Sequence, residues 1–94
     1  MIKEPIWLYA LRCRDDTFYI GVSKDVEGRF RCHRKGKGSF YTRLNKPEAI
    51  VAAQAFPDRT SAMRAEIALK SCSAVEKHAW IRHWPWPNAD HIEQ

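Results

Sequence analysis

Two tyrosines, an arginine and a histidine recur at a regular spacing near the start of the chain. Tyr19 follows Tyr9 by ten residues, Arg29 follows Tyr19 by ten more, and His33 lies one helical turn beyond Arg29. Tyrosine and histidine side chains can accept or donate protons, and an arginine can steady a developing negative charge. Core packing alone does not explain this set in a strongly basic chain. The spacing therefore predicts phosphodiester chemistry.

Length and composition set the broad class of the protein. A chain of 94 residues allows one domain, which we place at residues 1–84, with residues 85–94 as a C-terminal tail. No apolar run approaches the roughly 20 residues needed to span a bilayer, and the first residues lack the apolar stretch of a secretory signal. We therefore exclude a membrane protein and expect a cytoplasmic location. Three widely spaced cysteines also fit a reducing compartment, and the absence of Cys-x-x-Cys and His-x-x-x-His pairs argues against zinc.

Basic side chains cluster within fifteen residues of a chain whose net charge is +5. They are Arg29, Arg31, Arg34, Lys35, Lys37 and Arg43, with His33 and Tyr41 among them. A basic cluster mixed with aromatic residues predicts a surface for a polyanion, most often nucleic acid. A solvated helix face is the alternative that charge alone leaves open. The residues that we expect to bind substrate are Gly21, Arg31, Lys35, Lys37, Tyr41 and Arg43.

Alternating apolar residues at the start of the chain predict a β-hairpin. Ile6 to Leu11 and Phe18 to Val22 have β-strand composition, and the polar residues between them form the turn. A turn centred on Asp15 would set Tyr9 opposite Gly21, with Tyr19 diagonal to Tyr9 on the same face.

One more strand and three helices complete a predicted β-β-α-β-α-α order. Asp25 caps a helix that ends near Gly36, residues 37–47 form a loop, and residues 49–56 form the third strand. A second helix covers residues 58–71, and the capping box from Ser73 to Glu76 opens a third, which ends near His83. The fold class is therefore α+β, with a three-stranded antiparallel or mixed sheet.

Glu66 lies inside an apolar arc of the second predicted helix. On a helical wheel the arc runs from Leu69 to Met63 and Ile67. Desolvating a carboxylate costs several kcal/mol, so Glu66 needs a cation. That cation is either Lys70, in an i, i+4 pair worth about 0.2–0.5 kcal/mol on an isolated helix, or Mg²⁺ or Mn²⁺ completed by water. The wheel leaves both open.

Several of these residues also carry a likeness to a known family. They are Leu8-Tyr9-Ala10, Phe18-Tyr19-Ile20-Gly21-Val22, Asp25, Arg29, His33, Gly36-x-Gly38 and Arg64-Ala65-Glu66. The pattern resembles the GIY-YIG nuclease family, especially its small stand-alone bacterial branch, from about residue 7 to residue 81. The second motif and the Arg29/His33 spacing are specific, whereas the first motif has Trp7-Leu8-Tyr9 where the family name has Gly-Ile-Tyr.

The resemblance implies a metal-dependent endonuclease that cuts DNA. By this resemblance Tyr9 and Tyr19 are the phenols of the site, and Arg29 is the phosphate clamp. Glu66 would bind Mg²⁺ or Mn²⁺, and Lys24 would help to place the water. His33 occupies a position that is histidine or tyrosine in relatives. We take Tyr9 as the base; a tyrosine has an unperturbed pKa of about 10, so a metal or another cation must favour its phenolate. One departure concerns an asparagine that many relatives carry on a later helix, because the only asparagine after Glu66 is Asn88, in the predicted tail.

Three functions remain open on this basis. The first is a nuclease, and the second is a catalytically inactive nucleic-acid-binding module of the same fold. The third is a protein-interaction domain that docks through Trp80, Trp84 and Trp86, which does not explain the tyrosine spacing.

The form of the DNA is also open: duplex, structured or single-stranded. A domain this small has few surfaces that could grip a duplex. Phe40, Tyr41 or Trp84 could instead stack on unpaired bases. The alternative is that Phe40 and Trp84 simply close the core. We therefore hypothesise a preference for single-stranded or frayed DNA, with a protein partner as another route to targeting.

Overall fold

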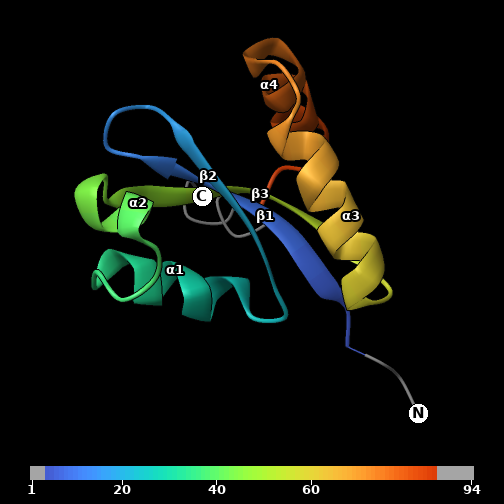
Figure 1. Cartoon of the computed structure of the whole chain (residues 1–94), viewed down its shortest axis with the longest axis horizontal. Coiled ribbons are helices and arrows are strands. Elements are labelled where there is room, and N and C mark those ends of the chain that lie inside the picture. Colours follow the sequence, from blue (N-terminus) through green and yellow to red (C-terminus); the bar gives the residue numbers. More distant parts are fainter. Residues whose placement is uncertain (1–3, 87–94) are drawn as a thin grey trace, which may run out of the picture.

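Seven helices and strands follow one another in the computed structural model, which describes residues 4–86 (Figure 1). Their order is β1 (Ile6–Cys13), β2 (Phe18–Ser23), α1 (Val26–Arg34), α2 (Phe40–Leu44), β3 (Pro47–Phe56), α3 (Arg59–Lys70) and α4 (Ala74–His83). The strands form one antiparallel sheet in the order β2-β1-β3, so β1 is central. The predicted α+β class and three-stranded sheet are confirmed. Within the described part of the chain, none of the helices is long and apolar enough to cross a membrane.

The β1–β2 hairpin sets the register on which the candidate site depends. Tyr9 pairs with Gly21, and Leu11 pairs with Tyr19, as predicted. Because side chains alternate along a strand, Tyr9 and Tyr19 face the same side of the sheet. The turn ends at Asp16, which takes a left-handed φ of 65°, a conformation that aspartate tolerates better than most residues.

Two apolar clusters hold helices to opposite faces of the sheet. One face packs on α3 and α4 through Leu8, Ala10, Ile20, Ala52, Leu69, Trp80 and Ile81. The other packs on α1 through Tyr9, Leu11, Ile50, Ala53, Val26 and Phe30. Figure 1 shows the result, with α1 and α2 on one side of the strands and α3 on the other. Any site that uses groups from both sides must therefore lie at an edge of the sheet.

Side-chain caps fix where the longer helices begin. The carboxylate of Asp25 accepts a hydrogen bond from the Gly28 amide at 3.0 Å at the start of α1. Asp58 does the same for the Ser61 amide at 2.8 Å before α3, and Ser73 opens α4 with the predicted capping box. These local signals explain why the predicted helix starts are confirmed.

The predicted loop at residues 37–47 contains a helix, which corrects the sequence analysis. Helix α2 begins at Ser39, whose hydroxyl oxygen accepts from the Thr42 amide at 3.2 Å in a capping box. Five residues are too few to show a helical period, and threonine replaces the glutamate or glutamine of the usual box. The correction matters because α2 carries Tyr41 and Thr42 to the site.

Helix α3 contacts the sheet through a narrower stripe than the wheel predicted. Ala62 and Leu69 are buried, whereas Met63 and Ile67 are 46% and 69% exposed. The small side chain of Ala62 lets the helix approach the strands closely, and this leaves the larger apolar groups outside. Glu66 lies at the border of the stripe, with 20% of its side chain exposed.

Pro85 and Trp86, the first residues of the predicted tail, contact the sheet. Pro85 forms an isolated bridge with Ala52, and the Trp86 amide donates to the Val51 carbonyl at 3.2 Å. The Trp86 ring also meets the ring of Trp7 edge-on, with 6.5 Å between centroids. These two residues of the predicted C-terminal tail therefore extend the packing on β3. The rest of that tail lies outside the described residues.

We expect Trp86→Ala to lower the free energy of unfolding. The ring pair with Trp7 is worth about 0.5–1.5 kcal/mol beyond the area that it buries, and denaturant titration measures the loss. Val75→Ala, at a side chain that is 77% exposed, is the control and should stay within about 0.5 kcal/mol of wild type. Equal stability of the two variants would show that residue 86 does not hold the sheet.

Candidate active site

Tyr9 is at the centre of the predicted cluster, and Gly21 determines how its ring lies. The Tyr9 side chain is 1% exposed. A methyl group at Gly21 would be 2.7 Å from Tyr9 Oη and 2.8 Å from its Cζ, closer than real carbon atoms approach. The phenol therefore extends from the central strand over Gly21 in edge strand β2. Gly21 is itself buried, so it provides space for Tyr9 rather than an open surface for substrate.

His33 connects Tyr9 to Thr42 of α2 and is fully buried. Its Nε2 lies 3.4 Å from Tyr9 Oη, and its Nδ1 lies 2.8 Å from Thr42 Oγ1. The Thr42 hydroxyl donates to the Ser39 carbonyl at 3.1 Å, so its oxygen accepts from Nδ1–H. The lone pair of His33 is then on Nε2, where the Tyr9 hydroxyl donates to it.

Burial, with the neighbouring Tyr19 as the next cause, raises the pKa of Tyr9 to about 12. The guanidinium of Arg29 opposes this rise, and the charge of Glu66 adds to it. Tyr19, Arg29 and Glu66 are therefore all within electrostatic reach of one phenol. At pH 7 this phenol is neutral, and its proton leaves only if an acceptor or an added positive charge is present.

The ring of Tyr19 packs beside the imidazole of His33. Their ring centroids are 4.7 Å apart and their planes are tilted by 55°. On its other side, Tyr19 lies nearly parallel to Tyr41, at 22° and 6.5 Å between centroids. Tyr19 thus separates the buried imidazole from the more exposed ring of Tyr41.

Burial, followed by the charge of Arg29, lowers the pKa of His33. The imidazole is therefore neutral at pH 7 and can accept a proton. Arg29 itself is exposed, and its Nη1 lies 3.9 Å from the Cys32 sulfur. Arg29 forms no ion pair with any other residue in the range 4–86, so no carboxylate there neutralises its charge, and a planar guanidinium suits a phosphate.

Glu66 forms an ion pair with Lys70, with 3.3 Å between Oε2 and Nζ. The i, i+4 alternative of the sequence analysis is therefore present. A carboxylate offers about four lone-pair directions on two oxygens, so one ammonium group leaves most of them for other partners. The pair does not by itself decide whether a metal ion also binds.

The other predicted residues surround this cluster without joining it. Lys24, Arg31, Lys35, Lys37 and Arg43 are all exposed. Within residues 4–86, Lys24 has no hydrogen bond or ion pair that would link it to the cluster.

Phe40 and Trp84 do not close the core. They are 69% and 38% exposed. The alternative in which these two residues close the core is therefore wrong.

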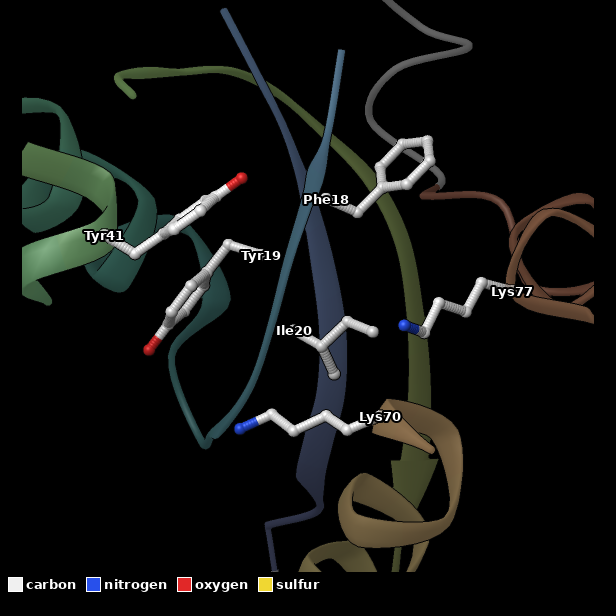
Figure 2. Close-up of a pocket in the computed structure, with 6 residues that line it drawn as sticks. All are labelled: Phe18, Tyr19, Ile20, Tyr41, Lys70 and Lys77. Atoms are coloured by element: carbon white, nitrogen blue, oxygen red, sulfur yellow. The ribbon is translucent and has the colours of Figure 1, made fainter. Parts of the chain in front are cut away.

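A hollow of about 310 Å³ opens beside Tyr19 at the outer edge of β2. Figure 2 shows the residues that line it: Phe18, Tyr19, Ile20, Tyr41, Lys70 and Lys77. The two tyrosines lie on the side of α1 and α2, and the two lysines reach in from α3 and α4. The hollow thus adjoins the cluster through Tyr19 and through Lys70, the partner of Glu66.

Comparison with known proteins identifies the domain. Residues 5–77 match the family model described as the GIY-YIG catalytic domain. The chain belongs to the GIY-YIG family. A UPF0213 protein of Xanthomonas axonopodis pv. citri is 44% identical over 82 residues, which cover 87% of this chain and 80% of that protein. A UPF0213 protein of Streptococcus agalactiae serotype V is 39% identical over 82 residues, covering 87% and 93%. The solution NMR structure of a UPF0213 protein from Bacillus halodurans has a TM-score of 0.57 and 36% identity, and the match covers 89% of both chains.

The GIY-YIG match includes every residue of the cluster around Tyr9. The sequence analysis missed Thr42, because that residue lies in a segment taken for a loop. The available signal was Ser39-x-x-Thr42, a hydroxyl pair at capping-box spacing. Lys77 was also missed, since nothing in the sequence shows that α4 turns back toward β2. Asn88, the only asparagine after Glu66 in the sequence, lies outside the described residues.

Gly21→Ala should disturb this GIY-YIG domain because the added methyl group would collide with Tyr9. Overpacking of this kind costs about 1–3 kcal/mol, which denaturant unfolding measures. Ala55→Val, an enlargement at an exposed position of β3, is the control and should cost much less. A Gly21→Ala variant as stable as wild type would contradict the close approach of Tyr9.

Thr42→Val should change the tautomer of His33. Without an acceptor for Nδ1–H, we expect the ring proton to move to Nε2. If it stays on Nδ1, the unpaired N–H lowers the free energy of unfolding by about 1–3 kcal/mol. Imidazole ¹⁵N chemical shifts, measured by NMR, distinguish the two tautomers. Thr42→Ser keeps the hydroxyl and should retain both the Nδ1–H form and the stability of wild type. A wild-type protein that carries its proton on Nε2 would overturn the hydrogen-bond direction given above.

Proposed function

We propose that this GIY-YIG protein is a metal-dependent endonuclease that hydrolyses phosphodiester bonds in DNA. The observation that most supports the proposal is the gathering of proton-transfer and charged groups from β1, β2, α1 and α3 around one buried phenol. These groups are Tyr9, Tyr19, Arg29, His33 and Glu66. Family membership supports the same conclusion, since the matched model is a catalytic domain.

Glu66 is the residue that would hold a metal ion. Among residues 4–86 no group of three histidine, cysteine or acidic side chains could hold one. Mg²⁺ does not require such a group, because it commonly binds through one or two carboxylates, several waters and the phosphates of a substrate. Glu66, partly exposed and with acceptor positions left over from Lys70, fits that requirement. When bound, Mg²⁺ or Mn²⁺ would neutralise phosphate charge and lower the pKa of an attacking water.

Tyr9 and His33 form the proposed proton path. As water attacks phosphorus, its proton passes to Tyr9 Oη while the phenol's own proton passes to Nε2 of His33. The bond from phosphorus to the leaving sugar oxygen then breaks, and that oxygen takes up a proton. His33 afterwards returns its extra proton to solvent. This path lets Tyr9 act as a base although its pKa is about 12, because the phenol never has to be a free phenolate.

Arg29 is the proposed phosphate clamp. Its planar guanidinium is always charged and can donate to two phosphate oxygens at once. A bound phosphate would also offset the positive charge that lowers the pKa of His33. Substrate binding would therefore make His33 a better proton acceptor at the moment when one is needed. Tyr19 orients the water or phosphate in this proposal, and Lys24 helps to place the water.

A DNA-binding module without catalysis is the second candidate. The Glu66–Lys70 ion pair favours it, because a carboxylate that already has a cation does not require a metal ion. The exposed basic side chains of α1 and α2 would serve either function.

We further propose that the substrate is single-stranded or structured DNA in the cytoplasm, where free Cys13, Cys32 and Cys72 are expected to persist. A protein partner that directs the domain to its target belongs to the same proposal. The support for an unpaired strand is the exposed ring of Tyr41, which is available for base stacking.

Glu66→Gln should reduce cleavage at least about a hundredfold, because metal-bound charge stabilisation is worth several kcal/mol. Affinity for DNA in chelator should stay near the wild-type value. The assay follows labelled single-stranded, duplex and branched DNA on gels, with Mg²⁺, with Mn²⁺ and with chelator.

Glu48→Gln is the matched control, since Glu48 also forms a 3.3 Å ion pair, with Arg12, on the surface. It should cleave like wild type. Wild-type cutting by Glu66→Gln would remove Glu66 from the mechanism. No cutting by any form of the protein, with only a small loss of melting temperature in Glu66→Gln, would support the DNA-binding module instead.

A further inference from the structure

The hollow beside Tyr19 is lined from both faces of the sheet. Tyr19 and Tyr41 come from the α1 and α2 side, and Lys70 and Lys77 from the α3 and α4 side. The hollow therefore lies at the outer edge of β2, which has no further strand beside it among residues 4–86. Figure 2 shows both lysine nitrogens pointing toward β2. A chain passing along this edge would contact all four residues.

A second hollow of about 320 Å³ continues the first along β2. The two share Phe18 and Lys77, and the second extends to the hairpin turn and to the start of α4. Asp16 is the one carboxylate among the residues that line either hollow, and it lies at the far end, next to the turn. The part nearest to the candidate active site is therefore lined by two lysines, three aromatic residues and Ile20, without a carboxylate.

Lys77 supplies a charge that no carboxylate balances. Its side chain is partly buried, and within residues 4–86 it forms no ion pair. A phosphate in the hollow would give this ammonium group a charged hydrogen-bond partner. Lys70 adds a second ammonium group. Its ion pair with Glu66 leaves N–H donors of that group for another acceptor. Phosphate groups fit two such lysines.

Tyr41 supplies a surface for a base. It is 37% exposed, and its hydroxyl is hydrogen-bonded to Thr17 in the hairpin turn, which fixes the ring at the rim of the hollow. The ring also lies nearly parallel to that of Tyr19. A fixed, partly exposed ring beside cationic groups is the arrangement by which proteins bind single strands without reading their sequence.

We propose that this edge of β2 binds the nucleotide next to the scissile phosphate of a single DNA strand, with its phosphates on Lys70 and Lys77 and its base on Tyr41. The proposal rests on the proposed nuclease function, and it adds the direction in which the strand leaves the site. Tyr19 and Lys70 belong both to the hollow and to the cluster around Tyr9 and Glu66, so the strand passes from one to the other.

The test measures binding of a fluorescein-labelled oligothymidylate by anisotropy, in chelator, over a range of salt concentrations. Each phosphate contact on a single strand contributes about −0.7 to the log–log slope of affinity against salt. Lys77→Gln, which keeps most of the aliphatic stem, should reduce the magnitude of the slope by about 0.7, and Lys77→Arg should restore it. Arg59→Ala is the control, because it removes one charge at the opposite end of α3 and should leave the slope unchanged.

Tyr41→Ala tests the base contact. It should weaken binding of the single strand at least about fivefold, the lower end for one stacked base, and should leave binding of a duplex unchanged. Equal weakening for duplex and single strand would overturn the single-strand assignment. A wild-type slope for Lys77→Gln, or an equal change for Arg59→Ala, would overturn the path along β2.

Chelator separates this proposal from the nuclease proposal. The binding assay needs no cleavage. If the protein never cuts DNA but the salt dependence of binding is weaker in Lys77→Gln, the strand path along β2 stands and the proposed nuclease function is wrong. If the protein cuts DNA and Lys77→Gln binds it like wild type, the nuclease function stands and the strand path is wrong. Circular dichroism and melting temperature of each variant confirm that the comparison is between folded proteins.

Discussion

The approach of the Tyr9 ring to Gly21 is the constraint on which the rest of the site depends. A phenol on the central strand of a sheet would ordinarily point into one of the two apolar layers. The missing side chain at Gly21 lets the ring extend sideways across β2, within 3.4 Å of His33 Nε2. Only from there is Tyr9 within electrostatic reach of Glu66, which belongs to a helix on the opposite face. The glycine of the second motif is thus a geometric requirement for joining the two faces.

The electrostatics of the cluster keep the resting site neutral. Burial raises the pKa of Tyr9 and lowers that of His33, so both groups resist charging and the proton between them stays on the phenol. The positive charge of Arg29 lowers the pKa of both groups. It favours the anionic phenolate of Tyr9 and disfavours the cationic form of His33. A phosphate bound to Arg29 would weaken both effects, which act in opposite directions on transfer of the proton from Tyr9 to His33.

The sequence was most informative where local rules decide the structure. The hairpin register that sets Tyr9 opposite Gly21 follows from strand alternation and a polar turn, and the starts of α1, α3 and α4 follow from capping side chains. The sequence was least informative where distant segments decide it. The packing of Trp86 on Trp7 depends on the return of the chain to β3, and the exposure of Ile67 depends on how closely Ala62 approaches the sheet. Neither is encoded within one helical turn or one strand.

The bare outer edge of β2 now has a physical explanation. An unpaired edge strand invites pairing with other chains, and proteins usually protect it with charges or a covering segment. Here the side chains of Tyr41 and Lys77 lie on opposite sides of β2, and a cation there would discourage pairing with another strand. A fourth strand beside β2 would fill the space between the tyrosines and the lysines. In this small sheet, the edge must remain uncovered for groups from the two faces to act on one substrate, and the lysines that protect it are the same groups that would hold a phosphate.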